Sequence, residues 1–436
     1  MRIKKTMLKT GLFLTLFSTT ACSPFVFIGG GNGIKPFANT NNTIFFALYN
    51  YYGIEGQHFT NKWLGMNDAL LEHGIQVTGY EAQKDAKKFK IKRLETSDLP
   101  KDAEIYMVNN QTWDTGLQYN KPLANKKPMA VISTCNGVEF AANPIKASGL
   151  GTQNATIGSF SDNYYKAFQD GSLSYLVTKY TAHVAPIFAA CVDAVEKGTA
   201  MKNADGTALQ LSVTNWAVTS IEQYDEMVKV DQFIMDTEKG IHPTIMKNNL
   251  DPFFTKSNAS YGAANLTKWV SESSYEQIYD LYHSNDGKTD TKRTGNKIKA
   301  GLLVPGSIND TVQAYIDYMK DYLADIYNVE FLTNEAISST NTQSIACKAL
   351  IDNGAQFIVS LQDDTDRNAA IKIADENNVF FGIAGTCQNP IDYETTKNYQ
   401  HFVGSIGTSI EEERRAAKEM TNYYLEKMIE RGEVTE

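Results

Sequence analysis

Residues 298–383 alternate short apolar runs with longer amphipathic stretches, and this alternation limits the fold more than any other feature of the sequence. Short apolar runs are typical of buried strands, and longer stretches with apolar positions three or four apart are typical of helices. We predict strands at residues 298–304, 329–332, 357–360 and 379–383, with helices at 310–327, 342–353 and 365–377 between them. Because strands that alternate with helices form parallel sheets covered by helices, this half is predicted to be an α/β lobe.

The same alternation is present, less regularly, in the first half of the chain. The predicted strands are residues 44–48, 75–80, 104–108 and 128–133, with a helix at 58–73 that Gly74 ends. These elements predict another parallel α/β lobe. Residues 201–296 follow neither pattern, and we expect an extra, mostly helical insert there, ending in a polar linker at 284–295.

Two short sequence matches link the halves. Residues 129–136 and 381–388 both run from an apolar strand into Thr-Cys and an amide, and Ile157-Gly158-Ser159 matches Val403-Gly404-Ser405 about twenty residues later. Two matches in the same order favour duplicated Rossmann-like lobes. Unrelated lobes that obey the same α/β rules are the alternative.

The start of the chain is typical of an export signal. Four basic residues within the first nine positions precede an uncharged run at residues 11–20, which is shorter than the ~20 residues that cross a bilayer. Residues 19–22, Thr-Thr-Ala-Cys, resemble the bacterial lipobox, although Thr19 stands where that motif usually has Leu. We predict cleavage before Cys22 and lipidation of its thiol; an ordinary signal peptide is the alternative. The Gly- and Asn-rich segment at 23–42 is predicted to be a flexible tether.

Charge and motifs exclude several functions. The net charge of −9 argues against a nucleic-acid partner, which requires clustered Lys and Arg. There is no HExxH pair, Gly-x-Ser-x-Gly elbow, Walker loop or Cys-x-x-Cys pair, so we expect no enzyme, no cofactor and no metal. Widely spaced cysteines leave disulfides and buried free thiols both open for the four that follow Cys22, namely Cys135, Cys191, Cys347 and Cys387.

Three segments resemble bacterial lipoproteins that serve as substrate-binding components of ABC transporters and have the type I periplasmic-binding-protein fold. They are residues 302–310, 351–360 and 377–383, and residues 157–164 resemble the strand of that family that leaves the first lobe. The resemblance implies two lobes and a small-molecule solute, in either the nucleoside-binding basic membrane lipoprotein branch or a sugar-binding branch. The length of this chain and its insert depart from the family pattern, which usually has one two-lobed unit.

The loops at the carboxyl ends of parallel strands meet at one edge of a sheet, where ligands of open α/β folds bind. Amides, carboxylates and aromatic rings in these loops suit a neutral polyhydroxy solute or a nucleoside. The ligand-binding residues predicted by this rule are Asn50, Tyr51, Tyr52, Asn110, Trp113, Thr134, Asn136, Ser307, Asn309, Asp310, Gln362, Asp363, Thr386 and Gln388. Glu139 follows the same strand as Thr134.

These observations predict a lipid-anchored protein on the outer face of the bacterial cytoplasmic membrane. It would capture a sugar or nucleoside between its lobes and deliver it to an ABC permease and ATPase complex. A surface sensor or interaction lipoprotein with the same fold is the alternative, followed by an exported hydrolase. The predicted organisation is a signal peptide (1–22), a tether (23–42), a first α/β lobe (43–200), an insert and linker (201–296) and a second α/β lobe (297–436).

Overall fold

The protein is described from a computed structural model. It describes residues 39–48, 56–78, 87–88, 90–94, 98–109, 123–134, 137–232, 247–256, 258, 260–285, 288–306, 308–332, 336–362 and 366–432. The predicted signal peptide, Cys22 and most of the tether lie outside these residues.

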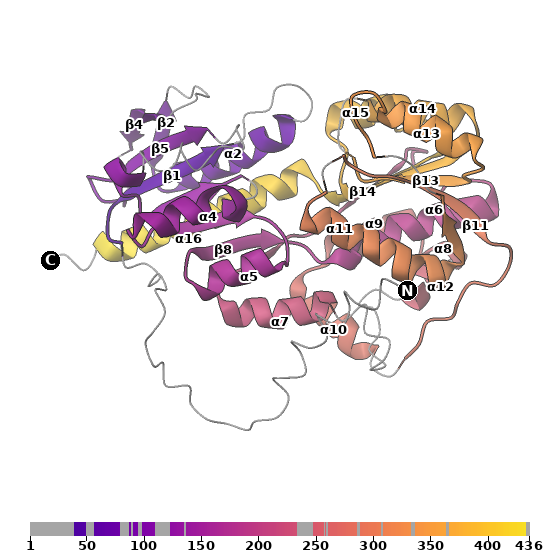
Figure 1. Ribbon diagram of the computed structural model, residues 1–436, viewed down its shortest axis with the longest axis horizontal. Helices are drawn as coiled ribbons and strands as arrows, with labels where there is room; N and C mark the ends of the chain where they lie inside the picture. Colours follow the sequence, from indigo (N-terminus) through magenta and orange to yellow (C-terminus); the bar gives the residue numbers. More distant parts are fainter. Residues whose placement is uncertain are drawn as a thin grey trace. The chain divides into compact units, whose positions relative to one another are not determined.

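The first sheet has seven strands, most of them parallel (Figure 1). Its order is β10-β8-β7-β6-β1-β5-β3, and β10 and β3 at the edges are antiparallel to their neighbours. The strands are β1 (Thr43–Leu48), β3 (Lys87–Lys88), β5 (Glu104–Asn109), β6 (Ala130–Ser133), β7 (Gln153–Ile157), β8 (Leu173–Thr178) and β10 (Trp216–Val218). The helices packed on it are α2 (Gly56–Glu72), α4 (Gly137–Ser148), α5 (Asp162–Gln169) and α16 (Ile410–Gly432).

Alternate side chains of the first sheet enter two separate cores. Ile44 and Phe46 of β1 pack with α2 and α16, whereas Phe45 and Ala47 pack with α4 on the opposite face. This alternation is the two-residue period of a strand buried on both faces. Helices therefore cover both faces of the sheet, and its polar loops are confined to its edges.

The second sheet has six strands, all parallel, in the order β12-β11-β13-β14-β15-β9. They are β9 (Leu209–Ser212), β11 (Ile298–Leu303), β12 (Val329–Phe331), β13 (Phe357–Ser360), β14 (Phe380–Thr386) and β15 (Phe402–Thr408). One face packs against α13 (Gln343–Asp352) and α14 (Arg367–Glu376). The other packs against α6 (Ala185–Lys197) and the helix formed by α11 (Asp310–Asp317), the π-helical turn η4 (Tyr318–Leu323) and α12 (Ala324–Tyr327).

The two sheets share one strand order and exchange one helix each. If β3 and the edge strands β9 and β10 are left out of the count, both sheets run second-first-third-fourth-fifth along the chain, and each then carries an edge strand from residues 209–218. After the fifth strand of the first sheet, α6 packs on β13, β14 and β15 of the second; after the fifth strand of the second, α16 packs on β6, β8 and α2 of the first. In Figure 1, α16 accordingly lies among the indigo and purple elements of the first sheet. The chain is an α/β protein with two Rossmann-like lobes, as predicted.

Close contact between α16 and α2 requires a glycine. A Cβ atom on Gly65 would lie 2.1 Å from the carbonyl oxygen of Arg414. The two helices also share an ion pair between Arg414 and Asp68, with 2.5 Å between Nε and Oδ2. These contacts hold a helix from the end of the second half against the start of the first.

The second half matches its predicted elements to within a few residues. The helix predicted at 310–327 is continuous through its π-turn, and the strands predicted at 298–304, 329–332, 357–360 and 379–383 are β11, β12, β13 and β14. Burial of both faces of β13 and of most of β11 and β14 accounts for this success, since it leaves continuous apolar runs in the sequence.

Three predictions about the first half are wrong. The strand predicted at 75–80 is β2 (Ile75–Thr78), but it pairs antiparallel with β4 (Lys90–Arg93) in a separate two-stranded sheet. In the first sheet, β5 and not β2 pairs in parallel with β1. The strand that leaves the first lobe is β8, not the one that ends at Ile157, because β7 leads into α5 on the same lobe.

The third error concerns the repeat. Residues 129–136 contain the third strand of the first sheet, whereas 381–388 contain the fourth strand of the second. An apolar strand followed by small polar residues is common to every parallel strand of an α/β sheet, so the sequence matches are one strand–helix unit out of step. The two sheets nevertheless share the same order of their five main strands.

The insert contributes to both sheets. Residues 209–218 supply β9 to the second sheet and β10 to the first. Four helices follow in the described residues: α7 (Ile221–Gln232), α8 (Lys247–Thr255), α9 (Ala263–Ser271) and α10 (Tyr275–Ser284). The lobe boundaries at residues 200 and 297 stay a prediction, and α6 and α16 are the elements whose packing does not follow their order in the chain.

Two further features concern the described residues alone. None of their helices combines the length and the apolar content that a bilayer crossing requires. Cys191, Cys347 and Cys387 are buried free thiols, and Cys135 lies outside the described residues.

Candidate functional site

Six of the predicted ligand-binding residues lie in the described part of the chain: Thr134, Asn309, Asp310, Gln362, Thr386 and Gln388. The others, together with Cys22, lie outside it: Asn50, Tyr51, Tyr52, Asn110, Trp113, Asn136, Ser307 and Asp363. All six lie at or just after the carboxyl ends of β6, β11, β13 or β14. We call the carboxyl-end loops of the first sheet the first rim and those of the second sheet the second rim.

Asn309 and Asp310 begin the helix that follows β11. The Oδ1 atom of Asn309 accepts a hydrogen bond from the backbone N–H of Val312 at 2.9 Å, so Asn309 is an N-cap. Asp310 occupies the first turn, where the helix dipole stabilises a carboxylate. Both side chains are exposed, so capping leaves the Asp310 carboxylate accessible at the second rim.

Thr386 ends β14 in an irregular part of the strand. Its pairing with β15 shifts register between Gly385 and Thr386, and Gly385 has a φ of +94°, which favours glycine. The Thr386 hydroxyl donates to the carbonyl of Cys387 at 3.2 Å, and its side chain is half-buried. Such bulges change the direction of the side chains beside them.

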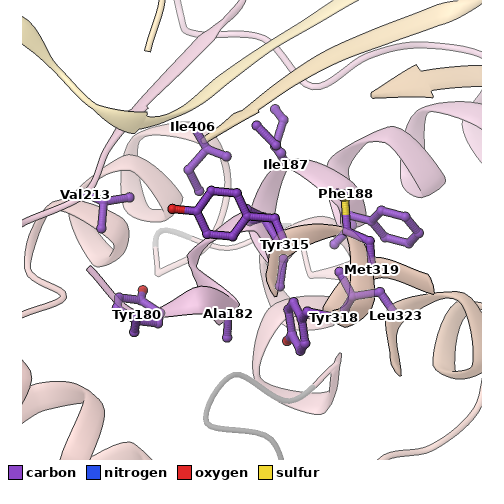
Figure 2. Packing of buried hydrophobic residues seen from close by; sticks show 14 of the residues in the cluster. Tyr180, Ala182, Ile187, Phe188, Val213, Tyr315, Tyr318, Met319, Leu323 and Ile406 are labelled. Atoms are coloured by element: carbon purple, nitrogen blue, oxygen red, sulfur yellow. The ribbon is translucent and has the colours of Figure 1, made fainter. Parts of the chain in front are cut away.

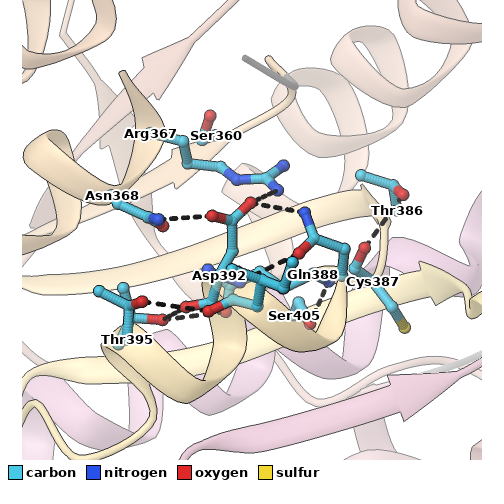
Figure 3. Close-up of polar contacts among 12 residues, drawn as sticks. Ser360, Arg367, Asn368, Thr386, Cys387, Gln388, Asp392, Thr395 and Ser405 are labelled. Carbon is cyan, nitrogen blue, oxygen red and sulfur yellow. Dashed lines mark hydrogen bonds and ion pairs between the residues drawn. The ribbon is translucent and has the colours of Figure 1, made fainter. Parts of the chain in front are cut away.

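Gln388 and Gln362 have local structural contacts. Gln388 is 3% exposed; its Oε1 accepts from the Thr396 hydroxyl at 3.2 Å, and its backbone N–H donates to Ser405 Oγ at 3.2 Å (Figure 3). The carbonyl of Gln362 accepts from Nε2 of the buried Gln343 at 3.3 Å. These hydrogen bonds to buried side chains hold the loops after β13 and β14 in place.

Arg367 was not selected by sequence reasoning. It is 1% exposed at the start of α14, and its guanidinium is 3.9 Å from Oδ2 of Asp392. The Asp392 carboxylate also accepts from the side-chain amides of Asn368 and Asn389, each at 2.6 Å (Figure 3). In the sequence, Arg367 directly follows the acidic segment 363–366, and that position could have marked it as a candidate. Only the carboxylates of this segment were considered.

The first rim is built around Thr134, Glu139 and Tyr164. Thr134 is buried and donates to the carbonyl of Ala47, with 3.5 Å between the oxygens. Glu139, in the first turn of α4, accepts from the Tyr164 hydroxyl at 2.9 Å. The rim thus offers an exposed carboxylate held in place by a buried phenol.

Each rim carries a carboxylate in the first turn of a helix. Although much of the residue is exposed, partial desolvation of its carboxylate raises the pKa of Glu139, the hydrogen bond from the Tyr164 hydroxyl opposes this increase, and the negative charge of Asp310 makes a smaller contribution. Glu139 belongs to the helix after β6, and Asp310 belongs to the helix after β11 on the other sheet. Each rim therefore carries a carboxylate that can accept hydrogen bonds.

A buried aspartate lies where the chain first crosses between the sheets. Asp231 of α7 is 7% exposed and accepts from the hydroxyl of Thr181 at 3.1 Å and from its backbone N–H. Burial raises the pKa of Asp231 to about 6, against the opposing effect of both bonds from Thr181. This carboxylate titrates within an ordinary experimental range.

We predict that Asp231 makes stability fall as the pH rises from about 4 to 6. Over this interval the folded chain keeps a proton that the unfolded chain has released, so the free energy of unfolding decreases by at most about 3 kcal/mol. Asp231→Asn keeps the shape without titrating and should remove this decrease. Urea unfolding at several pH values measures it, with Asp280→Asn on the exposed face of α10 as the control. An unchanged profile in Asp231→Asn would contradict the assignment.

The described residues offer no group of three or more His, Cys, Asp or Glu side chains that could hold a metal ion. The described residues of the rims offer hydrogen-bonding groups: carboxylates and carbonyls accept, and hydroxyls, amides and the Arg367 guanidinium donate.

Comparison with known proteins adds similar solved structures. Neither a family model nor a curated protein matches this chain. It is similar to an ABC transporter periplasmic solute-binding protein from Actinobacillus succinogenes with bound D-allose: identity is 10%, the TM-score is 0.44, and 90% of this chain and 92% of that chain are covered. It is also similar to a solute-binding protein from Mycobacterium smegmatis with bound glycerol, at 9% identity, a TM-score of 0.44 and 88% coverage of both chains.

A LacI family transcriptional regulator from Enterococcus faecium with bound ribose is similar at 11% identity and a TM-score of 0.40, covering 88% of this chain and 90% of that one. Because these identities and scores are low, we base the function on the chain's own residues.

Proposed function

We propose that this protein is an extracytoplasmic solute-binding lipoprotein that captures a small polar molecule, a sugar or a nucleoside, between its two rims for an ABC importer. The observation that carries the proposal is that two like-ordered parallel sheets each carry a carboxylate, Glu139 on one and Asp310 on the other, in the first helical turn after the carboxyl end of a strand. Loops at the carboxyl ends of parallel strands are where α/β folds bind ligands.

The residue types on the rims support a neutral, hydroxyl-rich solute. Each hydroxyl group of the solute can both donate and accept a hydrogen bond. The Glu139 and Asp310 carboxylates can each accept hydrogen bonds from two such hydroxyls. A carboxylate group on the solute would face the like charges of Glu139 and Asp310, so the rims disfavour anionic solutes. A sugar or the ribose of a nucleoside fits these requirements.

The proposed ligand set includes residues outside the described ranges. Tyr51, Tyr52 and Trp113 would stack on the flat face of the solute, and Asn50, Asn110, Asn136, Ser307 and Asp363 would hydrogen-bond to it. Thr134 and Gln388 are buried, so we propose that they act by holding the loops that carry the contacting residues.

Anchoring and transport are proposals from the sequence. The lipobox-like segment ending at Cys22 supports a lipid anchor, and the resemblance to solute-binding components supports an ABC permease and ATPase complex as the partner. Closure of two lobes around a solute is a change of shape that such a complex could sense.

A solute screen tests the proposal. The full chain should gain thermal stability with one class among D-ribose, D-glucose and adenosine, because a ligand that binds only the folded state stabilises it by about 2.7 kcal/mol at 100 times its Kd. Differential scanning fluorimetry measures the gain.

Glu139→Gln should reduce the gain by removing a carboxylate from the first rim. The matched control is Glu276→Gln, which alters an exposed first-turn glutamate on α10 and should leave the gain unchanged. A folded protein with no gain from any sugar or nucleoside contradicts solute capture and favours the sensor function.

A further inference from the structure

The chain passes between the two sheets three times in the described residues, and the passages are bonded to one another. They follow β8, β9 and β15. The backbone N–H of Val213 donates to the carbonyl of Gly407 at 2.8 Å, and the hydroxyl of Thr408 donates to Oδ1 of Asn215 at 3.3 Å. The backbone N–H of Asn215 donates to Oε1 of Glu412 at 2.6 Å.

Lys179 connects these passages to the second rim. It follows β8, and its ammonium donates to the carbonyl oxygen of Gly385 at 2.7 Å and to the hydroxyl oxygen of Thr408 at 3.0 Å. Both acceptors belong to the carboxyl ends of second-sheet strands. A single side chain from the first lobe therefore bonds to two neighbouring strands of the second.

The Gly385 carbonyl is part of the irregular strand end that carries Thr386. At this point β14 and β15 lose their regular register, and a Cβ atom on Gly407 would lie 2.3 Å from the Thr386 nitrogen. The backbone is thus closely packed, and Lys179 bonds to the carbonyl directly before Thr386. Charge-assisted hydrogen bonds of this kind are roughly twice as strong as neutral ones.

Charged and titratable groups from four elements face Lys179. They are Glu413 of α16, Lys62 of α2, Cys387 after β14 and His183 beside β8. Burial lowers the pKa of Lys179 to about 8, with Glu413 and Cys387 opposing the decrease and Lys62 adding to it. Its charge therefore changes at mildly alkaline pH.

We propose that Lys179 is a positioning residue for the solute site: its ammonium holds the Gly385–Thr386 bulge in the conformation that presents Thr386 at the second rim. The positioning of a solute rests on the proposed function, whereas the hold on the bulge is testable without any ligand.

Three variants of the full chain test this proposal. Lys179→Met removes the ammonium at similar length, and Lys179→Arg keeps the charge. Lys202→Met is the matched control, because Nζ of Lys202 donates to the carbonyls of Tyr399 and Phe402 at 2.7 and 2.6 Å and burial lowers its pKa to about 8 as well. Those acceptors lie at the opposite end of β15.

The first measurement is amide hydrogen exchange without ligand. In Lys179→Met, the amides of Thr386 and Cys387 should exchange about tenfold faster or more, because a charge-assisted bond beside them is lost. Lys179→Arg and Lys202→Met should exchange there like the wild type. Unchanged exchange in Lys179→Met, or an equal increase in Lys202→Met, would overturn the proposal.

The second measurement is the Kd of the probe, among D-ribose, D-glucose and adenosine, that stabilises the wild type. Lys179→Met should raise this Kd roughly tenfold, and Lys202→Met should leave it within about twofold. From pH 7 to 9 the wild-type Kd should rise as Lys179 loses its proton, and that of Lys179→Arg should stay flat. If faster exchange leaves the Kd unchanged, the bulge does not position the solute and the proposal is overturned. If no probe binds the wild type, solute capture is contradicted, and the exchange measurement alone decides the role of Lys179.

Discussion

Replacing Tyr424 with alanine should lower the free energy of unfolding by about 4 kcal/mol, the usual cost of an emptied aromatic site in a core. Tyr424 is fully buried on α16 within the core of the first sheet. Its hydroxyl lies 2.6 Å from Ser174 Oγ and donates to the carbonyl of Asn154 at 3.1 Å. The substitution removes both the ring and these bonds, and urea denaturation followed by circular dichroism measures the loss.

Two controls separate the ring from its surroundings. Tyr424→Phe keeps the ring and should cost about 1 kcal/mol for the hydroxyl alone. Tyr279→Ala alters a tyrosine that is 42% exposed and should cost less than about 1 kcal/mol. Equal losses in Tyr424→Ala and Tyr279→Ala would mean that α16 does not complete the core of the first sheet.

Replacing Phe188 with alanine should destabilise the protein by a similar amount, about 3–5 kcal/mol. Phe188 is fully buried on α6, and its ring centroid lies 5.5 Å from Phe357 and 5.8 Å from Tyr327. Both partners belong to the second lobe, although Phe188 precedes it by more than a hundred positions in the chain. Figure 2 shows Phe188 beside Met319 and Leu323, which belong to the η4 turn that covers the same face.

Phe188→Leu fills most of the same volume and should cost about 1 kcal/mol. Because each lobe holds a helix from the other half, Phe188→Ala and Tyr424→Ala should both shift one cooperative transition. Tryptophan fluorescence and circular dichroism should then report the same midpoint. Two separate midpoints in either variant would contradict this shared stability.

The sequence was most informative where strands are buried on both faces. The runs at 300–303 and 357–359 are continuous and carry no polar side chain, so the position and type of β11 and β13 followed directly from hydrophobicity. The strand β7 was hidden, because Gln153, Asn154 and Thr156 are polar and yet fully buried. The side-chain amide of Asn154 donates a hydrogen bond to the carbonyl of Gly137 at 2.8 Å, and no local sequence pattern indicates this tertiary contact.

Long-range pairing was beyond the sequence. Nothing in residues 209–218 indicates that β9 and β10 join different sheets, since the choice depends on which edge each strand meets after the chain turns. The exchange of α6 and α16 is likewise set by which apolar faces remain uncovered. Short-range periodicity identifies helices and strands but not their partners.

Candidate site residues followed from a topological rule, and the structure shows what that rule omits. It selected Asn309 and Thr386 because they lie at the ends of strands. It also selected Gln388, whose side-chain oxygen accepts a hydrogen bond from the Thr396 hydroxyl. It omitted Lys179, because residues 173–178, which form β8, were not among the predicted strands. Residues that connect the lobes are found through contacts distant in sequence.

The exchange of helices also fixes an order of events during synthesis. The core of the first sheet contains Ile44 near one end of the described chain and Met428 near the other. A ribosome must therefore release residues through about 428 before that core can close, however early β1 has been made. Until then the apolar faces of β1 and α2 remain uncovered and available to other proteins.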